Sequence, residues 1–123
     1  MDELFGEVIS RYSRKQALED GVLVDVSAMA REAGIKFPVA VTCAVFEILN
    51  DTSYPGQDVK GRAWDMLFVL RLAAKSSKGS QVHFAPLFVR EGSAKPRPVP
   101  MRALCGPGDD LKPVITVMLE GED

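Results

Sequence analysis

Cysteine and histidine are scarce in this sequence, and their scarcity limits the chemistry that one chain can assemble. The 123 residues include two cysteines, Cys43 and Cys105, and one histidine, His83. A zinc site of ordinary ligand spacing is therefore not expected within a single chain. Because both cysteines lie far apart in apolar segments, we expect small buried side chains in a reducing compartment rather than a disulfide.

Long apolar runs and a net positive charge are missing as well. No apolar stretch approaches the roughly 18 to 20 residues of a membrane span, and the opening MDELFGEVIS lacks the basic and apolar regions of a signal peptide. The formal net charge of -2 provides no global positive field for holding a nucleic-acid backbone. These absences predict a cytoplasmic protein without a membrane segment, in which nucleic-acid binding would depend on a local basic patch.

The overall composition is that of an ordinary folded protein. Apolar residues make up 46% and charged residues 26% of the chain, proportions that disfavour wholesale disorder. A chain of this length can bury roughly two thirds of its unfolded surface. No internal repeat or linker divides it, so we predict one domain over residues 1–123.

Capping residues and apolar periodicity predict four helices. A serine at one end and a glycine at the other bound two short helices, over residues 13–20 and about 27–34. The third, from residue 38 to about 50, is ambiguous because its valines also alternate as in a strand, but its length and its Ala, Glu and Leu content favour a helix. The longest, residues 58–75, is apolar nearly all round, which places it in the centre of the fold or in an interface.

Four further segments have the alternation of β-strands. The first is residues 22–26, and the other three are residues 82–90, 99–105 and 113–119, whose short links predict an antiparallel meander. Pro86 indicates a bulge or an edge position in the first strand of the meander, because proline cannot donate a ladder hydrogen bond. The last strand is apolar on both faces and is expected to be central.

These elements predict an α+β fold. A three- or four-stranded, mainly antiparallel sheet, with a C-terminal β-meander, would pack against the N-terminal helices. The strand at residues 22–26 would be the fourth member, beside the C-terminal strand.

A basic, proline-rich stretch, GSAKPRPVP, is one candidate interaction site. Lys95 and Arg97 could form an extended positive finger for a nucleic acid or an acidic partner, with prolines limiting the ordering cost. The alternative is a solvated hairpin loop whose prolines discourage edge pairing. We favour the hairpin, since no aromatic residue alternates with the charges to stack a base.

The long helix carries the other candidates. Arg62 and Asp65 are three residues apart and can pair on one surface. Arg71 shares a face with Trp64 and other apolar side chains, and an unpaired buried charge is costly. We favour an ion pair or a guanidinium that reaches water, with an interface or anion-binding arginine as the alternative.

The stretch CGPGDDLKPVITV raises the question of a phosphate-binding loop. It lacks the lysine and the following helix that such loops need, and its aspartates would repel a phosphate. Asp109 and Asp110 could hold a divalent cation, but a tight turn before a central strand is the favoured interpretation. His83 alternates with a phenylalanine and should point to the less buried face, where a structural role is more common than catalysis.

Several ordered segments resemble a known family. LFGEVISRYSRKQALEDGVLVDVS, AGIKFPVAVT, GRAWDML and CGPGDDLKPVITVMLEGED are similar to short bacterial proteins of unknown function associated with plasmids and other mobile elements. The similarity covers most of the chain and departs mainly at residues 50–57. It implies a cytoplasmic accessory protein and supplies no reaction, cofactor, catalytic residue or metal ligand.

The sequence therefore favours a non-enzymatic interaction module that binds a host or element-encoded macromolecule, with a homodimer as one arrangement and no cofactor. The alternative is a small transferase or hydrolase acting on a nucleotide-like ligand, beside the tryptophan of the long helix. The candidate interaction residues are Arg62, Trp64, Asp65, Arg71, Lys95 and Arg97.

Overall fold

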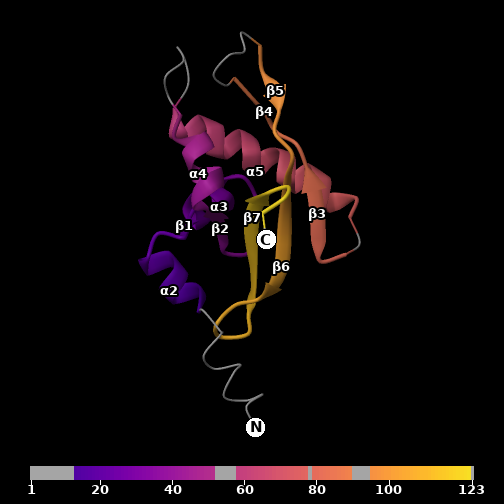
Figure 1. Cartoon of the computed structure of the whole chain (residues 1–123). Coiled ribbons are helices and arrows are strands. Elements are labelled where there is room, and N and C mark those ends of the chain that lie inside the picture. Colours follow the sequence, from indigo (N-terminus) through magenta and orange to yellow (C-terminus); the bar gives the residue numbers. More distant parts are fainter. Residues whose placement is uncertain (1–12, 52–57, 78, 90–94, 123) are drawn as a thin grey trace.

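A computed structural model of the chain describes residues 13–51, 58–77, 79–89 and 95–122 (Figure 1). In chain order its elements are α2 (Arg14–Glu19), β1 (Leu23–Asp25), α3 (Ser27–Glu32), β2 (Val39–Thr42), α4 (Cys43–Leu49), α5 (Val59–Lys75), β3 (Gln81–Phe84), β4 (Leu87–Phe88), β5 (Arg97–Pro98), β6 (Met101–Pro107) and β7 (Pro113–Leu119).

The main sheet has five strands in the order β1-β2-β7-β6-β3, and β4 and β5 form a separate antiparallel pair. β2 and β7 run parallel, whereas the other neighbours in the main sheet are antiparallel. The α+β fold, the meander of β3, β6 and β7 and the central place of β7 are confirmed. β1 lies beside β2 rather than beside the C-terminal strand, which corrects the predicted strand order.

The fifth strand comes from the segment predicted as the third helix, from residue 38 to about 50. Val39, Ala40 and Val41 are completely buried in β2, as is usual for a strand that pairs in parallel and is covered on both faces. The Thr42 hydroxyl then accepts a hydrogen bond from the Val45 amide at 3.3 Å and caps α4. The predicted helix from residue 38 is therefore wrong for residues 38–42 and right for Cys43–Leu49, because residues 39–41 pair with β7 and the Thr42 cap then starts the helix.

The core lies on one face of the sheet, where α3, α4 and α5 pack. Residues directly opposite on neighbouring strands share this face, as Val82 and Ala103, and Ala103 and Val117, do. Helix α5 begins after Asp58, whose carboxylate accepts from the Gly61 amide at 2.6 Å, and it runs for 17 residues. Helix α2 lies near the end of the sheet that carries the β6–β7 turn (Figure 1).

Proline divides the first predicted meander strand. β3 ends at Phe84, Pro86 is buried, and the chain leaves the main sheet to form β4. The Pro86 carbonyl accepts from the Val99 amide at 2.9 Å, so the separate β4–β5 hairpin begins there. β3 itself is an edge strand, as the proline indicated.

Among the described helices, none combines the length and the apolar character required to cross a bilayer.

Candidate functional site

Arg62 lies inside the molecule, with 2% of its surface exposed. Its Nη1 donates to the carbonyl of Ile48 at 2.7 Å, and its Nη2 donates to the carbonyl of Val89 at 2.6 Å. The guanidinium also lies 5.2 Å from the ring centroid of Phe88, a cation–π distance. Ile48 belongs to the last turn of α4, where carbonyls need partners from outside the helix. Arg62 therefore joins α5 to α4 and β4, and this is a structural role.

Three large apolar side chains form a row on the solvent side of α5. Trp64, Phe68 and Leu72 are four residues apart and fall within about 80° of one another around the helix. They are 37%, 38% and 49% exposed. The Trp64 and Phe68 rings stack with centroids 5.4 Å apart and an interplanar angle of 11°. We call these three residues the α5 stripe; Asp65 is an exposed neighbour on the same helix.

Opposite the stripe, α5 contributes Ala63, Met66, Leu67 and Leu70 to the core. The apolar residues predicted all round the helix thus divide into a buried set and an exposed row. An exposed row of large apolar side chains is the kind of surface that marks a contact with another macromolecule.

Arg71 lies beside a hollow of about 460 Å³, near the end of α5. Lys36, Arg71 and Lys75 are the charged residues of its lining, and Leu70, Val82 and Ile115 are among its aliphatic residues. We call this hollow the Arg71 groove. Arg62, Trp64 and Asp65 do not line it, so the structure does not bring the four α5 candidates to one pocket.

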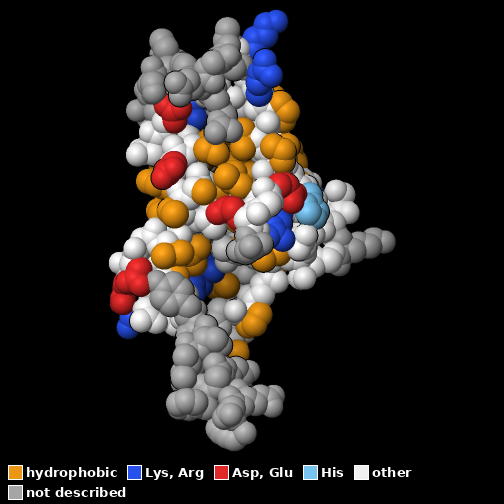
Figure 2. Space-filling view, viewed as in Figure 1, with side chains coloured by type: hydrophobic (Ala, Val, Ile, Leu, Met, Phe, Trp, Pro, Cys, Tyr) orange, Lys and Arg blue, Asp and Glu red, His pale blue; other side chains and the backbone are white. Residues whose placement is uncertain are grey.

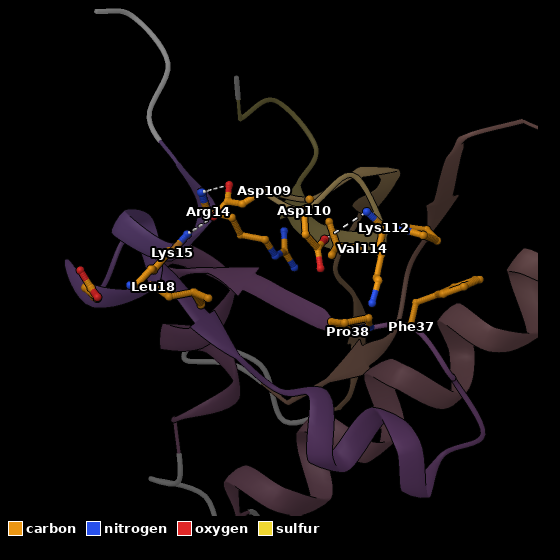
Figure 3. A pocket seen from close by; sticks show the side chains of 12 residues that line it. Arg14, Lys15, Leu18, Phe37, Pro38, Asp109, Asp110, Lys112 and Val114 are labelled. Atoms are coloured by element: carbon orange, nitrogen blue, oxygen red, sulfur yellow. Dashed lines mark hydrogen bonds between the residues drawn. The ribbon is translucent and has the colours of Figure 1, made fainter. Parts of the chain in front are cut away.

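A second hollow, of about 690 Å³, lies between α2, the β6–β7 turn and the residues that precede β2 (Figure 3). Lys15 and Leu18 line it from α2, Phe37 and Pro38 from the segment before β2, and Lys112 from the turn. Cations, carboxylates and apolar side chains are mixed in this lining, which gives it no single electrostatic preference.

Arg14 and Asp109 connect the two sides of this second hollow. The Asp109 carboxylate accepts from the backbone amides of Arg14 at 3.0 Å and Lys15 at 2.9 Å, and so caps α2 from 95 residues away (Figure 3). The Arg14 guanidinium donates to Thr116 Oγ1 at 2.7 Å and to the Ile115 carbonyl at 2.8 Å. Burial lowers the pKa of Arg14, and the charges of Asp25 and Asp109 partly oppose this.

The β6–β7 connection is thus a turn, as favoured from the sequence. The Asp110 carboxylate accepts from the Lys112 amide at 3.0 Å, and the Gly108 amide donates to the Lys112 carbonyl at 2.8 Å. Both oxygens of Asp109 are engaged by α2, an arrangement that leaves this carboxylate poorly placed for a cation. Across the described residues, no group of three or more His, Cys, Asp or Glu side chains gathers as a metal site would require. No local signal in the sequence indicated the contact between this turn and α2.

The basic candidates Lys95 and Arg97 are both exposed. Arg97 belongs to β5 and is paired in register with Phe88 of β4. The hairpin projects from the body of the molecule, and basic side chains gather at its end (Figures 1 and 2). β4 and β5 pair antiparallel on either side of residues 90–94, which lie outside the described residues. The structure places this basic surface far from the β6–β7 turn.

His83 and the two cysteines lie outside both hollows or at their margins, and all three side chains are exposed. His83 is exposed, as predicted, and its Nδ1 lies 2.5 Å from Glu120 Oε2 (Figure 2). Cys43 and Cys105 are free thiols and both are exposed, which corrects the expectation of burial. Cys43 begins α4 on the side away from Val45, and Cys105 lies near the end of β6, so an apolar sequence context was misleading for both.

The fold and these surfaces define a small α+β protein with an exposed apolar stripe on its longest helix. The chain belongs to a family of unknown function (DUF6573), which matches residues 1–123. No curated protein and no solved structure matches it. The family carries no activity from which a site could be assigned, so any function must be argued from the geometry.

Proposed function

We propose that the protein is a non-enzymatic interaction module that binds another protein through the α5 stripe, and that a second copy of the chain is its partner. The observation that carries this proposal is the exposure of Trp64, Phe68 and Leu72 in one row. A helix that supplies the core from one side and exposes aromatic side chains on the other is suited to helix-against-helix contact. Aromatic residues are also enriched where protein interfaces gain most of their binding energy.

The spacing of the stripe suits self-association. Trp64 and Leu72 lie four residues on either side of Phe68, so the row is nearly symmetric about its centre. If two α5 helices pack antiparallel, Phe68 meets its own copy, and Trp64 meets Leu72 of the partner subunit. A two-fold dimer requires such a self-complementary surface, because the same patch is used on both subunits.

Light scattering after size exclusion tests the proposal through the mass of the protein over a concentration series. We expect the mass of a dimer for the unmodified chain. Leu72→Asp should return it to a monomer, because a charge would be buried in the contact. Leu111→Asp is the matched control: Leu111 is 79% exposed at the β6–β7 turn, and this change should leave the dimer intact.

Trp64 provides an independent signal, because it is the one tryptophan in the sequence. Burial of its ring in an interface should shift its emission to shorter wavelength as the concentration rises, and Leu72→Asp should abolish that shift. A chain that is monomeric at high concentration, with emission independent of concentration, contradicts self-association through the stripe.

We further propose that the module is a cytoplasmic accessory protein of a bacterial mobile element, a placement that rests on the resemblance of its sequence. A host or element-encoded macromolecule could bind at the β4–β5 hairpin. If a nucleic acid binds there, Lys95→Glu with Arg97→Glu should weaken the complex, and so should added salt. Fluorescence anisotropy with a labelled duplex measures both effects, and binding that neither change alters would exclude the hairpin.

A further inference from the structure

We infer that the Arg71 groove binds a small anionic amphiphile, a molecule with one carboxylate head and an aliphatic body. Among the described residues, the charged members of its lining are Lys36, Arg71 and Lys75, all cationic, whereas most of its remaining side chains are apolar, with Phe37 as the aromatic member. This combination selects for negative charge at one end of a ligand and for apolar surface along the rest. The inference is independent of the α5 stripe and of self-association.

Arg71 is positioned for a ligand in a way that Arg62 is not. It is half-buried, and within the described residues its guanidinium has no hydrogen bond or ion pair to another side chain or carbonyl. Its stem and guanidinium instead pack against Gly34, where an added Cβ would lie 3.0 Å from Nε and 3.2 Å from Cζ. The glycine thus leaves room for the guanidinium at the groove, with its donors open to a carboxylate.

The other two cations stand on different elements. Lys36 precedes β2 and Lys75 lies in the last turn of α5, so positive charge reaches the groove from two directions. A lysine in the last turn also offsets the negative end of the helix dipole, which would otherwise disfavour an anion there. Both lysines are exposed, so they can attract and follow a ligand head while their charges remain hydrated.

The floor of the groove determines the body of the ligand. Leu70, Val82, Ala103 and Ile115 line it with aliphatic side chains from α5 and from strands β3, β6 and β7, and Phe37 adds one aromatic ring. An alkyl chain can lie on such a floor, whereas a nucleobase would lose hydrogen bonds to water there without replacement. The volume of about 460 Å³ lies within the range of small-molecule sites. These features favour a medium-chain carboxylate over a nucleotide.

Isothermal titration calorimetry of the full chain tests this inference with three probes of different chemistry. Decanoate carries the anionic head and the alkyl body, decyltrimethylammonium carries the same body with the opposite charge, and adenosine monophosphate carries an anion on a base. We expect decanoate to bind saturably at 1:1 and the other two probes not to bind. Equal binding of the cationic amphiphile would show that the cations do not select the ligand and would overturn the inference. Binding of the nucleotide without decanoate would overturn the choice of ligand.

Two substitutions place the binding in the groove. Arg71→Gln should weaken decanoate binding about tenfold, the effect of losing one charge-assisted contact, whereas Lys60→Gln at the other end of α5 should leave it unchanged. Ala74→Phe fills the groove from an exposed position on α5 and should abolish binding, with folding checked by circular dichroism. Decanoate binding that survives both Arg71→Gln and Ala74→Phe would show that the groove is not the site.

A last variant separates this inference from the proposed dimer. Leu72→Asp, which should abolish dimerisation, is expected to retain decanoate binding, since Leu72 does not line the groove. An unmodified chain that is monomeric but binds decanoate through Arg71 would contradict the dimer alone. An unmodified chain that forms the dimer but fails to bind decanoate would contradict the groove alone.

Discussion

The two arginines near the ends of α5 have opposite surroundings. Arg62, at the end of the first turn, is buried and donates to two main-chain carbonyls, whereas Arg71, nine residues later, is half-buried beside a groove. Near Arg62, α5 lies beside the C-terminal end of α4 and the end of β4, where backbone carbonyls need donors. Near Arg71, α5 lies beside Gly34 and the apolar lining of the groove. Among the described residues, these give the Arg71 guanidinium space but no acceptor.

The difference teaches that burial of a charge follows from the backbone groups around it rather than from the apolar residues beside it in sequence. A buried cation is tolerated where it satisfies groups that would otherwise be unpaired. A cation without such groups stays in contact with water, where it is available to a ligand. The same helix therefore carries one structural arginine and one arginine suited to binding.

The largest expected effect comes from Arg62→Ala. It should lower the free energy of unfolding by about 3 kcal/mol, because two buried carbonyls lose a charged donor and a cavity opens beside Phe88. Urea denaturation followed by circular dichroism measures the change. Lys60→Ala, at an exposed cation two residues before it, should change the stability by less than about 0.5 kcal/mol. Equal effects of the two substitutions would remove the structural role assigned to Arg62.

The next effect tests the space that Gly34 leaves for Arg71. Gly34 has φ of +93° and Gly21 has φ of +79°, but nothing lies within 4 Å of a Cβ added at Gly21. Gly21→Ala should cost about 1 kcal/mol for the left-handed backbone alone, and Gly34→Ala should cost about 2 kcal/mol because the methyl group also crowds Arg71.

A double-mutant cycle isolates the steric part of that cost. In an Arg71→Ala background, the excess cost of Gly34→Ala over Gly21→Ala should disappear, since no guanidinium remains to be displaced. An excess that persists would mean that Arg71 does not rest on Gly34 in solution.

Asp109→Ala tests a carboxylate whose two oxygens both accept hydrogen bonds from α2. Removing the cap of two α2 amides should cost about 1 kcal/mol and accelerate amide hydrogen exchange in α2. Asp110→Ala removes one local hydrogen bond of the turn and should cost less, without any effect on exchange in α2. Similar exchange in both variants would contradict the long-range cap.

Arg71→Ala should have the smallest effect on stability. We expect a change of less than about 0.5 kcal/mol, because its charge satisfies no described backbone group and remains hydrated. Thermal unfolding of this variant beside Arg62→Ala provides the direct comparison. A loss as large as that of Arg62→Ala would make both arginines structural and would weaken the case for the groove.

Much of the fold followed from local patterns. The apolar content of residues 58–75 predicted α5 nearly to the residue, and the proline at position 86 marked the edge of the meander. The valine-rich segment from residue 38 was harder, because alternation and helical content were both present. Its division at Thr42 depends on the parallel partner β7, which lies more than 70 residues away and which no short window contains.

The candidate site was less accessible to sequence reasoning than the fold. Helical spacing placed Arg71 on one face with Trp64 but did not show that Trp64 is exposed. The same spacing suggested a surface pair for Arg62, whose acceptors belong to α4 and the end of β4. Which side of α5 is buried depends on where α3, α4 and the sheet pack, and this is a property of the whole chain.

By itself the sequence determined the local elements of this protein: the two short helices, the long apolar helix, the meander and the GPGDD turn. These depend on backbone preferences and on hydrogen bonds between residues close in the chain. Only the tertiary structure decided that Asp109 caps α2, that Arg62 is enclosed and that Arg71 borders a groove. A charged side chain takes its role from the groups that surround it, and here those groups come from distant segments.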